Sequence, residues 1–246
     1  MRHNVDSANA GFVRLNGLMS QKKMSLNMNT SKLNILVIDD EKNHRRSAEM
    51  LLKGHNLLVV GSYDEAAGFL TSKIDYGFAN ILQKDKGLSY AEAIEKATTR
   101  PNFDVVLTDL MMPASRSAQG PEGLAFVGKQ MPVGTFLILL ALAAGVKNIG
   151  MVTDMNHHNH PASAALDPIG GSVITVGETK IFATNNARLK SFDEVTGEHL
   201  SYEFLNSEEG KEKYPEMEKY GSRKGVFSGK GWDTILETLL AGKSEE

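Results

Sequence analysis

Short apolar runs that end in acidic residues constrain the fold of this chain more than any other feature. They are rich in β-branched residues, as strands buried on both faces are, which is the usual situation of parallel strands. These runs and their acidic ends are residues 33–38 before Asp39 and Asp40, residues 103–108 before Asp109, and residues 149–153 before Asp154. Helical patterns alternate with them, so the chain is predicted to be an α/β protein with right-handed crossovers.

The spacing of apolar residues, caps and breakers predicts the other elements. Strands are expected at 57–60 and within 173–184, where the pattern is that of one strand or of a hairpin turning at Gly177-Glu178. The predicted helices are 42–53, a helix opened by the capping box Ser62 to Glu65, another opened by Ser89 to Glu92, an apolar helix at 133–146, and a final helix at 232–240. Together they predict a doubly wound, five-stranded parallel sheet.

The 246 residues leave a choice between two domains and one enlarged domain. An isolated helix as short as 232–240 is marginal in water, so we expect it to dock on the sheet that begins near residue 33. That predicts one domain over 32–246, preceded by a flexible polar tail at 1–31. The extra length is assigned to insertions at about 76–100, 111–132 and 185–231, the last interpreted as an exposed, charged excursion.

Composition excludes several classes of protein. The formal net charge of −3 argues against electrostatic wrapping of nucleic acid, and the absence of cysteine excludes disulfides and thiolate chemistry. The longest apolar stretch, 133–146, is too short to span a membrane, and the first residues lack the apolar core of a secretory signal. We therefore expect a cytoplasmic protein with no nucleic-acid partner and no membrane partner.

Carboxylates are predicted to gather at one edge of the sheet. The carboxyl ends of parallel strands meet there, and these are the ends that carry Asp39 and Asp40, Asp109, and Thr153 with Asp154. Such carboxylates repel one another unless a cation neutralises them, and hard oxygen ligands with open positions suit Mg²⁺. A carboxylate beside such an ion can act as a nucleophile toward a phosphoryl group.

Three segments resemble the bacterial response-regulator receiver domain. They are Ile35-Leu-Val-Ile-Asp-Asp-Glu41, Asp104-Val-Val-Leu-Thr-Asp-Leu-Met-Met-Pro113 and Met151-Val-Thr-Asp154, of which the second is the most specific. The resemblance implies a flavodoxin-like fold in which Asp109 accepts a phosphoryl group from a histidine kinase or phosphotransfer protein. It also implies that Mg²⁺ is held by Asp39, Asp40, Asp109 and the backbone carbonyl of Met111, with Thr153 as the switch hydroxyl.

The chain departs from the receiver pattern in ways that bear on the site. Receivers carry a Lys-Pro pair at the end of the fifth strand, which this sequence lacks, and Lys180 is the nearest candidate although it would lie at the wrong end of a strand over 180–184. The cluster His157, His158 and His160 follows the fourth strand. These histidines are interpreted as solvated loop residues, as contacts to the phosphoryl site, or as ligands of a second metal such as Zn²⁺ or Ni²⁺.

Three functions remain in view. The first is a stand-alone receiver that signals to a downstream protein through contacts, since few residues follow 232–240. Its oligomeric state is left open by the sequence, with a homodimer, as many receivers form, among the alternatives. The second is a degenerate receiver acting as an interaction scaffold, which the missing Lys-Pro pair favours. The third is an aspartyl-nucleophile phosphohydrolase, disfavoured because Met111 stands where such enzymes carry a second aspartate. The chain is therefore expected not to be an enzyme beyond its own phosphorylation and dephosphorylation.

Overall fold

The computed structural model describes residues 32–99, 101–115, 120–217 and 223–241. The predicted tail at 1–31 lies outside these residues, so that prediction is untested. The part of the chain from Lys32 onward forms one compact unit. Within the segments described, no helix is long and apolar enough to cross a membrane.

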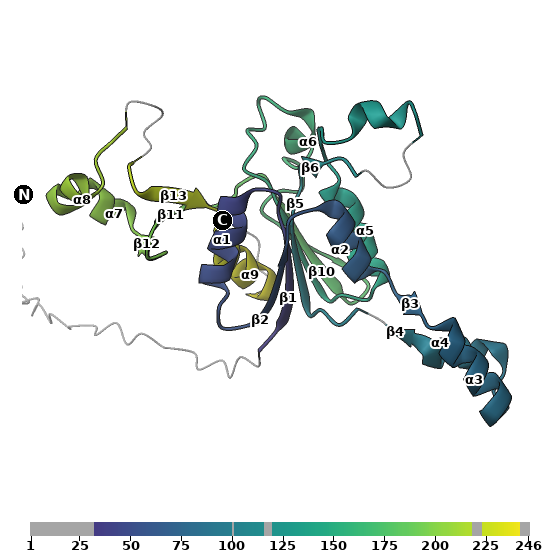
Figure 1. Ribbon diagram of the computed structural model, residues 1–246. Coiled ribbons are helices and arrows are strands. Elements are labelled where there is room, and N and C mark those ends of the chain that lie inside the picture. The colour runs from purple at the N-terminus through teal and green to yellow at the C-terminus, as the bar shows by residue number, and fades with distance from the viewer. Residues whose placement is uncertain (1–31, 100, 116–119, 218–222, 242–246) are drawn as a thin grey trace, which may run out of the picture. The chain divides into compact units, whose positions relative to one another are not determined.

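A six-stranded sheet forms the centre of this unit (Figure 1). Its order is β2-β1-β5-β8-β10-β9, and all neighbouring pairs are parallel except β10 and β9. The strands are β1 (Asn34–Ile38), β2 (Asn56–Val60), β5 (Val105–Asp109), β8 (Asn148–Val152), β9 (Val173–Val176) and β10 (Thr179–Thr184). The five parallel strands have the 2-1-3-4-5 order of flavodoxin-like folds, which confirms the predicted fold class. Two alternatives, one strand or a hairpin, were predicted for residues 173–184. The structure has the hairpin, formed by β9 and β10.

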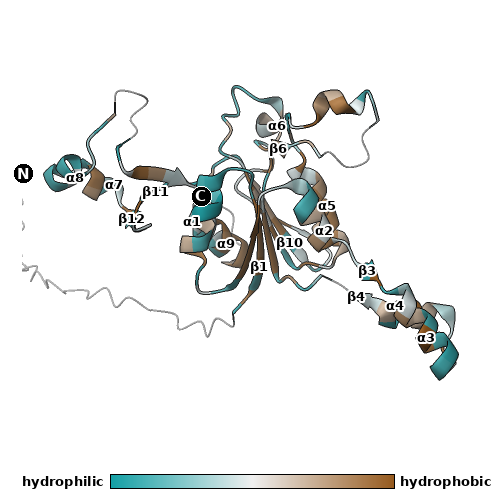
Figure 2. Cartoon of the chain, viewed as in Figure 1, coloured by the Kyte–Doolittle hydropathy of each residue, from teal (hydrophilic) through white to brown (hydrophobic). Residues whose placement is uncertain are grey.

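Helices cover both faces of the sheet. On one face, α1 (Lys42–Leu51) and α9 (Trp232–Ala241) pack on alternate residues of β1, including Ile35 and Val37. On the other face, α2 (Tyr63–Leu70) and α5 (Gly134–Ala143) pack on Leu36 and Ile38. Figure 2 shows the strand β1 in brown between these helices, while α1 is largely teal. The final helix thus docks on the sheet as predicted.

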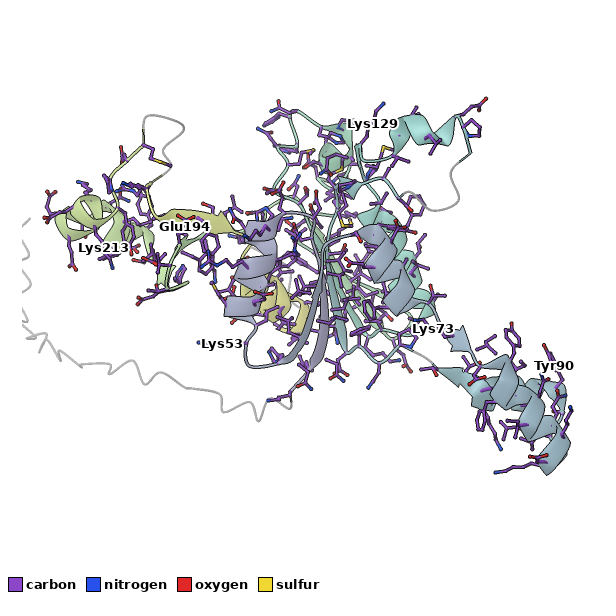
Figure 3. The ribbon with its side chains drawn as sticks, viewed as in Figure 1. Lys53, Lys73, Tyr90, Lys129, Glu194 and Lys213 are labelled. Carbon is purple, nitrogen blue, oxygen red and sulfur yellow. The ribbon has the colours of Figure 1, made fainter. Side chains whose placement is uncertain are left out.

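The insertion after α2 is a pair of helices. It runs through β3 (Lys73–Ile74), α3 (Tyr76–Lys86), α4 (Tyr90–Ala97) and β4 (Thr98–Thr99). The Ser89 capping box is present, and Ala79 packs with Leu82 in a small core of this pair. No helix was predicted over α3, because its apolar residues lie around the whole helix, some exposed and some buried, and form no single stripe. Asp75 caps the helix by accepting from the backbone N–H of Phe78. Figure 3 labels Tyr90, which is largely exposed at the start of α4.

The insertion after β5 is short of regular structure. It contains β6 (Met112–Pro113), the 3₁₀ helix η1 (Gly123–Phe126) and β7 (Gln130–Met131), which pairs antiparallel with β6. Between β8 and β9, the chain forms one helix of four residues, α6 (Pro161–Ala164). The ends of β5 and β8 are therefore flanked by loops rather than by long helices.

The insertion after β10 is packed, which corrects its interpretation as an exposed excursion. It forms a three-stranded sheet of β11 (Lys190–Asp193), β12 (His199–Leu200) and β13 (Val226–Gly229), with helices α7 (Tyr202–Asn206) and α8 (Glu208–Lys213). Its strands have only two to four residues each, so their pattern was weak in the sequence. Arg46 of α1 donates to the carbonyl of Glu194, 2.5 Å away, a residue labelled in Figure 3. The insertion therefore contacts the helix layer of the central sheet.

Candidate functional site

Three aspartates lie together at the carboxyl edge of the sheet. Asp39 follows β1, Asp40 is next to it, and Asp109 ends β5. One carboxylate oxygen from each residue lies within 4.8 Å of the others, and Asp39 and Asp109 are buried. The parallel alignment of β1 and β5 brings these two strand ends side by side. The predicted gathering of carboxylates is present.

A buried lysine lies between two of these aspartates. The Nζ atom of Lys230 is 2.7 Å from Oδ2 of Asp39 and 3.0 Å from Oδ1 of Asp109, and the lysine side chain has no exposed surface. Breaking a buried ion pair by removing one partner is costly because a charge remains without compensation. Lys230 therefore neutralises part of the negative charge of the two aspartates. It comes from the segment between β13 and α9 and not from a strand of the central sheet.

The packing of β13 against α1 places Lys230 in the pocket. At Gly229 a Cβ atom would lie 2.4 Å from Cβ of Ser47, so only glycine allows this close approach. The hydroxyl of Ser47 then donates to the carbonyl of Lys230 at 3.0 Å. On the other side, the indole Nε1 of Trp232 donates to the carbonyl of His44 at 2.9 Å. Contacts on both sides of Lys230 thus hold its backbone against α1.

Burial and mutual attraction set the ionisation of these groups. Burial raises the pKa of Asp109 to about 7; Lys230 opposes this shift and Asp39 adds to it. Burial also raises the pKa of Asp39, although attraction to Lys230 opposes it. Burial alone would lower the pKa of Lys230, but the two carboxylates outweigh burial and raise it. Burial disfavours the charged form of both carboxylates, and a cation bound beside them would offset this cost by favouring the charged form.

An open cavity of about 290 Å³ gives access to Asp109. Thr153, which follows β8, is buried and lines the same cavity, and its hydroxyl accepts from the backbone N–H of Met155 at 3.2 Å. Met111 lines the cavity as well. Gln130 of β7 donates from Nε2 to Oδ2 of Asp40 at 2.7 Å, so the insertion after β5 also reaches this edge. The candidate phosphoacceptor and the candidate switch residue therefore share one cavity.

The contact between His44 and Asp154 at the cavity was not predicted from the sequence. Nε2 of His44 on α1 lies 3.2 Å from Oδ2 of Asp154, and both residues line the cavity. The hydrogen bond from His44 lowers the pKa of Asp154 to about 2, so this carboxylate is ionised at neutral pH. The pair links α1 to the loop that follows Thr153.

The structure corrects the choice of lysine. Lys180 pairs with Asn148 at the amino end of β10, opposite the edge with Asp109, and its Nζ lies 3.4 Å from the carbonyl of Leu240. The cation at the site is Lys230, which sequence analysis placed inside the insertion at 185–231. One feature of the sequence could have indicated Lys230, namely its position just before the final helix. In a chain without the insertion, the end of the fifth strand would stand there.

The residues at this edge fit a divalent cation. Asp39, Asp40 and Asp109 form a set of hard oxygen ligands, which Mg²⁺ prefers. Oδ1 of Asp109 is buried and accepts no well-aligned hydrogen bond from the described residues, although Lys230 lies within ion-pair distance. Such an oxygen is available as a ligand. His157, His158 and His160 lie instead in the loop before α6 and do not join this acidic group.

Gly134 supports the strand end that carries Asp109. A Cβ atom at this position would lie 2.0 Å from the carbonyl oxygen of Asp109, a backbone atom that cannot rotate away. Gly134→Ala is therefore expected to displace the end of β5 and to lower the free energy of unfolding by roughly 1–3 kcal/mol. Urea denaturation measures this. Gly68→Ala in α2, where a Cβ atom meets nothing within 4 Å, is the control, and equal stabilities of the two variants would contradict the prediction.

Comparison with known proteins adds little to this picture. No family model matches the chain, and no curated protein matches it significantly. The receiver domain of the histidine kinase CKI1 from Arabidopsis thaliana, complexed with Mg²⁺ and BeF₃⁻, is 16% identical, with 55% of this chain and 76% of that chain covered and a TM-score of 0.28. The same domain complexed with Mg²⁺ is 15% identical, with coverages of 63% and 86% and a TM-score of 0.28. The strand order by itself shows a flavodoxin-like fold.

Proposed function

We propose that the protein is a phosphorylation-dependent switch in which Asp109 accepts a phosphoryl group. The observation that carries this proposal is the buried Lys230 at the carboxyl edge of the sheet. Its Nζ atom lies 3.0 Å from Asp109 and 2.7 Å from Asp39. Lys230 supplies the cation whose expected absence, together with the large insertions, favoured a degenerate scaffold. The donor would be a histidine kinase or a phosphotransfer protein, and a downstream protein would recognise the phosphorylated form.

The chemistry is a transfer between two nucleophiles. A carboxylate oxygen of Asp109 forms a bond to phosphorus while the bond from phosphorus to the donor nitrogen breaks, and the imidazole leaves with the electron pair. Asp39, Asp40 and Asp109, with the carbonyl of Met111, would hold Mg²⁺, which supplies positive charge to the phosphoryl oxygens. Lys230, whose Nζ is 3.0 Å from Asp109, would attract the same oxygens, and Thr153 lines the cavity in which they would lie.

Signalling would follow from the added negative charge. A phosphoryl group on Asp109 would compete for Lys230 and offer an acceptor to the hydroxyl of Thr153, which now accepts from the backbone of Met155. A switch of this kind biases a loop between two arrangements. Turnover of external phosphoesters is not expected, because Met111 cannot act as a general acid.

Asp109→Asn is expected to abolish phosphorylation, since an amide is not a nucleophile toward phosphorus. The full chain is incubated with acetyl phosphate and Mg²⁺, and the gain of one phosphoryl group is followed by intact mass spectrometry. Asp85→Asn on α3, far in sequence from the acidic edge, is the matched control and should be phosphorylated like the wild type. Phosphorylation that persists in Asp109→Asn, or that proceeds equally in excess EDTA, would refute the assignment.

A further inference from the structure

Two neighbouring histidines turn their rings toward each other in the loop between β8 and α6. The Nε2 atoms of His157 and His158 lie 3.0 Å apart, and the ring centroids are 4.0 Å apart. Asn156 shapes this turn, because its side-chain oxygen accepts from the backbone N–H of His158 at 2.8 Å. The two Nε2 atoms are hydrogen-bonded to each other, so the loop holds two imidazole nitrogens side by side.

A carboxylate fixes the orientation of the first ring. Nδ1 of His157 lies 2.9 and 3.0 Å from the two carboxylate oxygens of Asp167, and Asn185 donates to the same carboxylate at 2.6 Å. A carboxylate at Nδ1 keeps the proton on that nitrogen and leaves Nε2 with its lone pair. Metal-binding histidines are commonly oriented by such a partner. His157 is thus held in the tautomer that a metal ion requires.

The distance between the two nitrogens indicates the class of metal. With metal–nitrogen bonds of about 2.1 Å, nitrogens 3.0 Å apart subtend about 90° at the ion. That angle belongs to adjacent positions of square-planar or octahedral coordination, which Cu²⁺ and Ni²⁺ adopt with nitrogen ligands. We propose that His157 and His158 bind one such cation through their Nε2 atoms, with water in the remaining positions.

The composition of this site differs from the predicted cluster of three histidines. Nδ1 of His160 accepts from the backbone N–H of Ala162 at 3.1 Å, so this residue caps α6. Asp167 lies behind His157 and acts as a positioning residue. Both His157 and Asp167 are partly exposed, with 40% and 49% of their side-chain surface accessible, so an ion can enter from solvent. The site is separate from the acidic edge with Asp109.

Calorimetric titration with Ni²⁺ tests the proposal on the full chain without a polyhistidine tag. Every protein carries His3→Gln, which removes a competing histidine near the start of the sequence, and the buffer contains excess Mg²⁺ to fill the acidic edge. We expect one Ni²⁺ per chain. His158→Gln should weaken binding at least tenfold, and Asp167→Asn should weaken it about 10–100-fold. His199→Gln on β12, also exposed, should leave binding unchanged.

Spectra of bound Cu²⁺ distinguish binding at His157 and His158 from binding elsewhere on the protein. The paramagnetic resonance spectrum of bound Cu²⁺ should show nitrogen coupling that is reduced in His158→Gln. Circular dichroism should show unchanged folding of both loop variants, because their side chains are exposed. The proposal is overturned if Ni²⁺ does not bind, if His158→Gln binds it as tightly as the parent, or if raising the Mg²⁺ concentration displaces it.

Discussion

Lys230→Met should lower the free energy of unfolding of the metal-free protein by about 3–5 kcal/mol at neutral pH, the range observed when a buried ion pair loses one partner. Methionine keeps much of the volume of lysine but leaves Asp39 and Asp109 buried without their cation. The loss is measured by urea denaturation in EDTA. Lys180→Met, at the opposite edge of the sheet, is the matched control and should change stability by no more than about 0.5 kcal/mol.

The pH and Mg²⁺ dependence of this variant test its physical cause. Burial already raises the pKa of Asp109 to about 7, and loss of Lys230 removes the attraction that opposes this shift. A carboxyl group whose folded pKa is raised destabilises the fold as pH rises, so the deficit should be larger at pH 8 than at pH 6. Mg²⁺ should recover part of it, because the proposed Mg²⁺ site exists only in the folded state. If the loss of unfolding free energy changes with neither pH nor Mg²⁺ concentration, its cause is lost packing and not the unpaired charges.

Trp232→Ala should cost about 3–5 kcal/mol of unfolding free energy, the range for large buried aromatic residues. Trp232 is fully buried and packs with Ile235 and Leu239 of α9 against the sheet. Its indole also donates to the carbonyl of His44, so the substitution removes a hydrogen bond that ties α9 to α1. Because this is the only tryptophan, unfolding is followed by far-ultraviolet circular dichroism.

Two comparisons sharpen this second prediction. Trp232→Phe keeps most of the apolar contact and should lose less than half as much stability as Trp232→Ala. Tyr202→Ala removes an aromatic side chain that is 80% exposed on α7 and should fall within about 0.5 kcal/mol of the wild type. Equal losses for Trp232→Ala and Tyr202→Ala would mean that α9 does not complete the core.

The sheet was predictable from sequence because its strands are buried on both faces. The runs ending at Asp39 and Asp109 are continuous and apolar, and their position before the acidic residues also predicted which carboxylates meet. The α3 helix was missed because its apolar residues lie around the whole helix and form no single stripe. In the insertion after β10, strands of two to four residues are too short to show the pattern of a packed sheet, although Phe192 and Phe227 stack within it.

The cation of the site could not be read from the sequence in the same way. A receiver-like chain is expected to carry its lysine at the end of the fifth strand, but this chain leaves the sheet after Thr184 and returns to the site at Lys230. Only the close packing at Gly229 against α1 shows that the return ends inside the pocket. Contacts between residues far apart in sequence decide this point, and local pattern does not encode them.

The long separation of Asp39 and Lys230 has a consequence for folding. Their ion pair joins residues 191 positions apart, so its formation closes a loop that spans most of the chain. Contacts of such high sequence separation form slowly, because the entropy of loop closure is lost before the contact is gained. During synthesis, the strands that carry Asp39 and Asp109 emerge long before Lys230 does. The acidic edge is therefore expected to depend on dissolved cations for neutralisation until the last helix has been made.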